Sequence, residues 1–175
     1  MIARYTRPEL GSLWTDQAKM DAWRDVEVAA AEALDGPTED ELEAIRGATF
    51  TVEAVQEREA VTDHDMAAFV DVLAASAGPA GRWIHFGLTS SDVLDPALAL
   101  QLRRAGEPVL AGARALAAAA ERAGTEGRRF GVVATGRTLA RLFRITGLAA
   151  GVPMFASLSD AVRELLSAGV RDTAC

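Results

Sequence analysis

The chain has 175 residues, half of them hydrophobic, and a formal net charge of −7. This length suits one domain, or one domain and part of another, and the apolar content argues against a disordered chain. The acidic balance argues against nonspecific nucleic-acid binding, which needs a basic surface, although a few local arginines can still hold a small anion.

Cysteine content and hydropathy predict a cytoplasmic protein. Cys175 is the only cysteine, so no intrachain disulfide can form. The N-terminal residues contain no apolar segment of the kind found in secretory signals, and no uninterrupted apolar run reaches the ~20 residues that span a membrane. We therefore expect neither a membrane nor a nucleic acid as a partner.

Four helices are predicted before the Gly78–Gly81 break. The first covers residues 15–34, the second 38–45 and the third 52–59, and the second opens with capping-box spacing. The fourth covers residues 65–76, with Thr62 and Asp65 again at cap spacing. Its apolar residues recur at helical spacing and predict one buried face, formed by Met66, Phe69, Val70 and Leu73.

A long helix is predicted from about Asp92 towards Ala123. Pro96 falls near its first turn, where proline costs little, whereas Gly106–Pro108 should kink or split it. The expected apolar stripe of this helix consists of Leu94, Leu98, Ala105, Val109, Ala113 and Leu116. After about residue 124 the character of the sequence changes. Two further helices are expected there, at 137–148 and 157–168, and no β-alternation is visible.

Both histidines of the chain lie where a helix should begin. His64 lies in the segment 62–65, and His85 lies in the segment 83–92, which joins a glycine turn and several hydroxyls to the long helix. Hydroxyls and unpaired backbone N–H groups at a helix start favour a site for a small anionic substrate. Ordinary helix capping by the same residue types is the alternative, and His85, between two apolar neighbours, can be a packed structural residue.

Several separated segments resemble one enzyme family. They are residues 4–14, 27–32, 41–45, 62–69 and 85–95. Together they resemble the N-terminal part of adenylosuccinate lyase, a branch of the fumarase/aspartase superfamily. The string His85-Phe86-Gly87-Leu88-Thr89-Ser90-Ser91-Asp92-Val93-Leu94-Asp95 carries the closest resemblance and is specific to this branch.

The resemblance implies an all-α fold, in which a small N-terminal helical domain is followed by a long helix of an incomplete helical bundle. The implied divisions are the helical lyase domain at 1–90, the start of the central bundle at 91–123 and a divergent tail at 124–175. Members of the family form homotetramers whose active sites draw on three subunits, so a homotetramer is the implied assembly.

The resemblance also implies a chemistry, the β-elimination of fumarate from adenylosuccinate to give AMP. A succinyl-aminoimidazole carboxamide ribotide of purine biosynthesis is the second implied substrate, and neither a metal nor an organic cofactor takes part. The implied substrate-binding residues are Arg4 and Tyr5 for the nucleotide, Asp63, His64 and Asp65 in the substrate pocket, and Thr89 and Ser90 for the succinyl group.

Elementary chemistry is compatible with these roles. Thr89, Ser90 and the helix start offer hydrogen-bond donors to a dicarboxylate. His64 between two carboxylates should favour its charged form, which suits anion binding or proton donation. The plain alternatives are a solvated N-terminal Arg4 and a helix-start His64 without a ligand.

The tail departs from the family pattern at its catalytic residues. The family continues with Gly-Arg-Thr-His-Gly, whose histidine is the usual general acid, but here Leu139 follows Gly136–Thr138. The usual base is a serine in a mobile loop much further along the chain. We therefore expect no catalytic residue in this chain and no activity from it alone. A shifted reading frame with an early stop is one explanation of the tail, and a true divergent C-terminus is the other.

Two rival functions remain open. One is another lyase of the superfamily or a carboxymuconate-type cycloisomerase, against which the Arg4-Tyr5 opening favours a purine substrate. The other is a non-catalytic helical module that binds a ligand or a partner helix.

Overall fold

The computed structural model describes residues 4, 6–145, 147 and 151–167. The chain divides into two compact units, Met1–Pro108 and Val109–Cys175. Within the residues that the structure describes, no helix is both long enough and apolar enough to cross a membrane.

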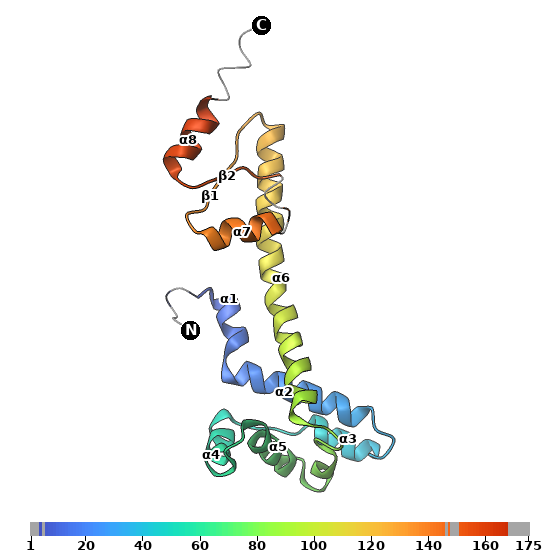
Figure 1. Ribbon diagram of the computed structural model, residues 1–175. Coiled ribbons are helices and arrows are strands. Elements are labelled where there is room, and N and C mark those ends of the chain that lie inside the picture. Colours follow the sequence, from blue (N-terminus) through green and yellow to red (C-terminus); the bar gives the residue numbers. More distant parts are fainter. Residues whose placement is uncertain (1–3, 5, 146, 148–150, 168–175) are drawn as a thin grey trace. The chain divides into compact units, whose positions relative to one another are not determined.

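The N-terminal unit is built of helices only (Figure 1). In chain order they are α1 (Pro8–Gly11), η2 (Ser12–Trp14), α2 (Asp16–Glu32), α3 (Glu39–Arg46), α4 (Val52–Thr62), α5 (Asp65–Ser76), η3 (Gly78–Trp83) and the first part of α6 (Ser90–Thr125). The predicted all-α class is confirmed, and the four predicted helices match α2, α3, α4 and α5.

Threonine side chains define where α2, α3 and α4 begin. Thr15 and Thr51 each accept the backbone N–H three residues further on, at 3.1 Å. Thr38 and Glu41 form the expected capping box at the start of α3. These bonds satisfy N–H groups that a helix start otherwise leaves unpaired, so the sequence fixes each start locally.

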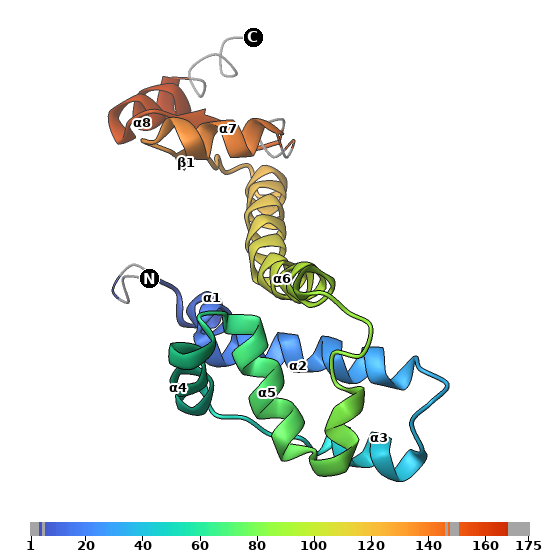
Figure 2. The same cartoon turned by 60° about the horizontal axis from the view of Figure 1, so that its bottom comes forward.

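An aromatic cluster lies at the centre of this unit. Phe69 of α5 meets Trp23 of α2 and Phe50 edge to face, with ring centroids 5.3 Å apart in both pairs. Such pairs add to the stabilisation that burial itself provides. The predicted face of α5 is confirmed, since Met66 and Leu73 are buried with Phe69 and Val70 packs beside them. Helices α4 and α5 lie side by side (Figure 2).

The packing of η3 against α5 requires a residue without a side chain in η3. Gly81 is buried, and its backbone lies so close to α5 that a Cβ would collide with the carbonyl oxygen of Ala74. η3 leads from there through Ile84 into the segment that precedes α6. Gly81 therefore sets the path by which the chain reaches the start of α6.

α6 is one helix although it contains Pro96 and Pro108. The expectation was that residues 106–108 should kink or split this helix; the split does not occur, and the kink stays a prediction. A proline removes one backbone hydrogen bond and crowds the carbonyl four residues earlier, which a long helix rich in Ala and Leu absorbs locally. The helix also begins at Ser90 rather than Asp92, so Pro96 lies beyond the first turn.

The buried face of α6 in the N-terminal unit matches the expected stripe at Leu94, which is half-buried against the core, and otherwise differs from it. Val93, Ala97 and Gln101 are buried, and the Gln101 amide donates to the carbonyl of Leu13 at 2.7 Å. Leu98 is 47% exposed. The buried Val93 and Ala97 each come one residue before a position of the expected stripe. This face also includes the small residue Ala97 and the polar residue Gln101.

The C-terminal unit contains a feature that the sequence did not predict. β1 (Val132–Val133) and β2 (Met154–Phe155) form a parallel pair, with α7 (Arg137–Ile145) between them in the chain and α8 (Leu158–Ser167) after them. Strands of two residues are too short to leave an alternating pattern. The two tail helices were predicted, although the expected ends at Leu148 and Ala168 lie outside the described residues.

Candidate functional site

The first candidate segment is the tight junction between α4 and α5. Asp63 adopts a left-handed conformation, φ 49°, and its N–H donates to the carbonyl of Glu59 at 2.9 Å. His64 is the N-cap of α5, and its Nδ1 accepts the N–H of Ala67 at 3.3 Å. The expected cap Thr62 is instead the last residue of α4, because the left-handed turn at Asp63 shifts the capping position to His64.

The capping role of His64 bears on its charge. A ring nitrogen that accepts an N–H carries no proton, so this arrangement holds the neutral imidazole with its proton on Nε2. Asp65 Oδ1 lies 3.8 Å from Nδ1 and itself accepts the N–H of Met66 at 2.7 Å. The cap therefore uses Nδ1 as an acceptor, and the expectation of a charged His64 stays a prediction.

The second candidate segment precedes α6 and contains two left-handed residues, His85 at φ 62° and Gly87 at φ 74°. Thr89 donates twice to Asp92 Oδ2, from its backbone N–H at 2.8 Å and from its hydroxyl at 2.9 Å. Ser90, the first residue of α6, is half-buried. The Thr89–Asp92 pairing is the capping arrangement that the sequence left open as an alternative to an anion site.

These bonds favour the ionised carboxylate of Asp92. The Thr89 backbone N–H has the largest effect in lowering the pKa of Asp92, followed by the Thr89 hydroxyl. Burial acts in the opposite direction, and positive charge on His85 lowers the pKa further. The start of α6 therefore carries a negative charge beside Thr89 at neutral pH.

A buried carboxylate lies behind the second segment. Glu27 of α2 has no exposed surface, and its two oxygens meet His85: Oε2 accepts the His85 N–H at 2.7 Å and Oε1 lies 2.6 Å from Nδ1. Sequence reasoning did not assign Glu27 to the site. The available signal was its place on the buried stripe of α2, where it follows Met20 and Trp23 at helical spacing.

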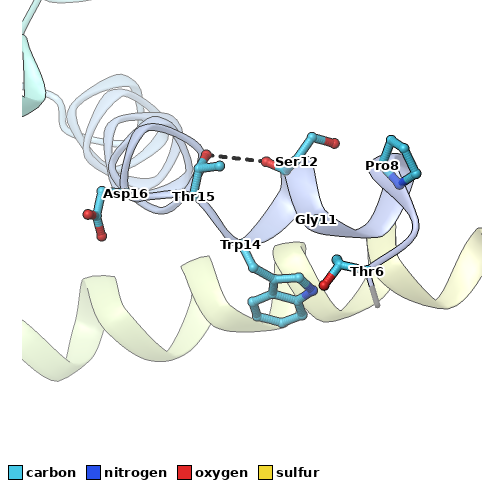
Figure 3. Close-up of a pocket in the computed structure, with 7 residues that line it drawn as sticks. All are labelled: Thr6, Pro8, Gly11, Ser12, Trp14, Thr15 and Asp16. Atoms are coloured by element: carbon cyan, nitrogen blue, oxygen red, sulfur yellow. Dashed lines mark hydrogen bonds between the residues drawn. The ribbon is translucent and has the colours of Figure 1, made fainter. Parts of the chain in front are cut away.

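The N-terminal residues assigned to the nucleotide are only partly described, and a separate cavity involves the residues that follow them. Arg4 is exposed, and Tyr5 lies outside the described residues. A cavity of about 620 Å³ opens between the chain before α1 and the start of α2 (Figure 3). It is lined by Thr6, Pro8, Gly11, Ser12, Trp14, Thr15 and Asp16. Of the six predicted site residues that the structure describes, none lines this cavity.

The structure thus gathers the predicted residues into local groups. Asp63, His64 and Asp65 share the α4–α5 junction, and Thr89 and Ser90 share the start of α6 with His85. Among the described residues, no hydrogen bond or ion pair joins the first group to the second. The described part of the chain also contains no cluster of three or more His, Cys, Asp or Glu that could hold a metal ion.

Leu139, which stands where the resemblance places a general acid, lies in α7. A leucine cannot exchange a proton, so α7 offers no acid at this position.

Comparisons with known proteins bear out the resemblance. The chain is 45% identical over 117 residues to adenylosuccinate lyase of Aquifex aeolicus (strain VF5), an alignment that covers 63% of this chain and 27% of that protein. It is 49% identical over 108 residues to the adenylosuccinate lyase of Synechocystis sp., covering 58% and 25%, and 40% identical over 114 residues to that of Bacillus subtilis (strain 168), covering 63% and 26%. The chain therefore spans about a quarter of these relatives. No protein-family model matches it.

A solved structure supports the fold independently. The crystal structure of fumarate lyase from Mesorhizobium sp. BNC1 superposes with a TM-score of 0.54 at 27% identity, over 65% of this chain and 29% of that one. By resemblance, then, the chain is related to helical lyases, and its similarity to adenylosuccinate lyases extends over about three fifths of its length.

Proposed function

We propose that this chain contains the N-terminal lyase domain of an adenylosuccinate lyase, at residues 1–90, and contributes one share of a substrate site. The observation that carries the proposal is the 45% identity over 117 residues with a curated adenylosuccinate lyase. The proposed setting is purine biosynthesis in the cytoplasm, with a succinylated purine nucleotide as the ligand and a homotetramer as the assembly.

The proposed reaction is a β-elimination. A base removes a proton from the succinyl carbon, the electron pair forms the double bond of fumarate, and the C–N bond breaks as an acid protonates the leaving nitrogen. Adenylosuccinate would give AMP, and the succinyl-aminoimidazole carboxamide ribotide would give the free carboxamide. Each step moves one proton and one electron pair, so no redox partner is required.

The proposed contribution of this chain to the substrate site is to bind the substrate. Arg4 and Tyr5 would contact the nucleotide, and Asp63, His64 and Asp65 would line the pocket. Thr89 and Ser90 would contact the succinyl carboxylates from the start of α6, where a helix start favours anions. Because the Thr89 hydroxyl donates to Asp92, binding through this hydroxyl requires that it rotate away from the carboxylate.

Catalysis by this chain alone is not part of the proposal. Leu139 occupies the position of the acid, and loss of an acid or base typically costs ~10²–10⁴-fold in rate. This observation favours the second candidate function, a non-catalytic helical module that binds a ligand or a partner helix.

Nucleotide titration with a fumarate assay tests both candidates. We expect weak binding of adenylosuccinate by calorimetry, further weakened in Ser90→Ala, and no fumarate release. Ser91→Ala is the matched control, since Ser91 is the neighbouring exposed hydroxyl without an assigned role. Fumarate release that is lost in His64→Ala would show that the chemistry is misplaced. Equal binding by both serine variants would remove Ser90 from the site, and absence of binding would leave the non-catalytic partner-binding module.

A further inference from the structure

The two histidines use the same ring atom in different ways. In His64, Nδ1 accepts a backbone N–H and so has no proton. In His85, Nδ1 faces a carboxylate oxygen of Glu27 at 2.6 Å, so a proton must lie between these two atoms. The location of that proton decides what the remaining nitrogen of His85 can do.

The backbone of His85 limits the state of Glu27. An amide N–H can only donate, so Glu27 Oε2, 2.7 Å from the His85 nitrogen, must accept. The other oxygen, Oε1, then either accepts from a protonated Nδ1 or donates its own proton to a bare Nδ1. The first case is an ionised Glu27 with two donors, and the second is a neutral Glu27.

The two donor contacts and their short lengths favour the ionised case, whereas burial by itself disfavours a charged carboxylate. Glu27 has no exposed surface, and a buried carboxylate requires nearby donors, which His85 supplies to both of its oxygens. Contacts of 2.6 and 2.7 Å are typical of charge-assisted hydrogen bonds. Among the described residues, the charged groups that face His85 are Glu27 of α2 and Asp92 of α6.

We propose that Glu27 is a positioning residue that holds the proton of His85 on Nδ1, so that Nε2 is the only ring atom able to exchange a proton or bond a ligand. The contact ties α2 to a residue 58 positions away. It also anchors a histidine in the left-handed conformation, φ 62°, which is uncommon for residues other than glycine. The ring is 21% exposed and makes no hydrogen bond through Nε2 within the described part of the chain.

The consequence is a chain whose two histidines are held in opposite tautomers. Neutral His64 carries its proton on Nε2, as its capping bond requires, whereas neutral His85 carries it on Nδ1. An isolated imidazole exchanges between these forms, so each assignment reports the protein environment. His64 therefore serves as an internal control for His85. This inference concerns the contact between Glu27 and His85 and holds whether or not the chain binds a nucleotide.

Nitrogen-15 NMR of the full chain tests the proposal. Long-range proton–nitrogen correlations at about pH 8, where an unperturbed imidazole is neutral, identify the protonated ring atom. We expect a protonated Nδ1 in His85 and an unprotonated Nδ1 in His64. In Glu27→Gln, the amide oxygen keeps the backbone bond while the amide NH₂ donates to Nδ1. His85 should then switch to the Nε2-protonated form, with His64 unchanged.

Two results would overturn the proposal. One is an unprotonated Nδ1 in wild-type His85, which would mean that Glu27 is neutral and acts as the donor. The other is a folded Glu27→Gln variant in which Nδ1 stays protonated, which would mean that Glu27 does not determine the tautomer. Far-UV circular dichroism establishes whether the variant folds, and if it does not, the wild-type spectrum decides by itself.

Discussion

Replacing Glu27 with alanine should destabilise the N-terminal unit far more than the same change five positions later on α2. Glu27 and Glu32 both lie on α2, and each carboxylate is 2.6 Å from a cationic or ionisable nitrogen, on His85 and Arg46 respectively. Their burial differs, because the Glu27 side chain is fully buried and that of Glu32 is 42% exposed. The pair therefore compares a buried with a solvated carboxylate of the same residue type, on the same helix and at the same contact distance.

The expected magnitudes follow from that difference. Glu27→Ala leaves the His85 N–H and Nδ1 without their acceptor, and breaking a buried hydrogen-bonded pair costs about 3–5 kcal/mol. Glu32→Ala breaks a solvated ion pair, which contributes about 0–1 kcal/mol. We therefore expect the two free energies of unfolding to differ by about 2–5 kcal/mol.

Urea denaturation followed by tryptophan fluorescence measures this difference. Trp14, Trp23 and Trp83 all lie in the N-terminal unit, so the signal reports the unit that contains Glu27. Linear extrapolation gives each free energy, and an unchanged slope indicates the same exposed surface on unfolding. The reasoning is refuted if Glu27→Ala is no less stable than Glu32→Ala at equal slope.

Three further predictions concern other parts of the chain. Because Thr89 lowers the pKa of Asp92, this carboxylate should stabilise the start of α6 above about pH 4 and lose that effect as the pH falls through its folded-state pKa. In circular-dichroism melts at successive pH values, Asp92→Asn should reduce the loss of stability at acid pH. Phe69→Ala should cost about 3–5 kcal/mol in urea denaturation, and a loss below 1 kcal/mol would contradict its central place in the core. Leu98 and Val109 are 47% and 59% exposed, so light scattering should show concentration-dependent association that the double change to glutamate abolishes; a wild-type monomer at high concentration would count against this.

The helices of the N-terminal unit could be predicted because their signals are local. Thr15 and Thr38 specify helix starts through bonds to residues three positions away, and the spacing of Met66 and Phe69 specifies which face is buried. Such patterns need no knowledge of the rest of the chain. The replacement of Thr62 by His64 as the cap of α5 shows the limit, because it depends on the left-handed turn at Asp63.

The candidate site was predicted only as positions along the chain. Sequence reasoning placed His64 and Thr89 at helix starts, where the structure has them, and left capping open as their role. It did not identify the Glu27–His85 contact, because that contact joins residues 58 positions apart and depends on how α2 packs. A carboxylate on an apolar stripe indicates a buried partner but does not say which residue it is.

The geometry of the 85–92 segment depends on Gly81, which lies outside that segment. Since the backbone of η3 meets the Ala74 carbonyl where a Cβ would otherwise be, even alanine at residue 81 forces η3 and α5 apart. The shift would pass along the four residues to His85 and lengthen its bonds to Glu27, while leaving both groups chemically intact. A variant at Gly81 would therefore have the same effect as loss of the Glu27 carboxylate. A mutational screen that scored function alone would assign Gly81 to the site, although this residue only sets the distance between η3 and α5.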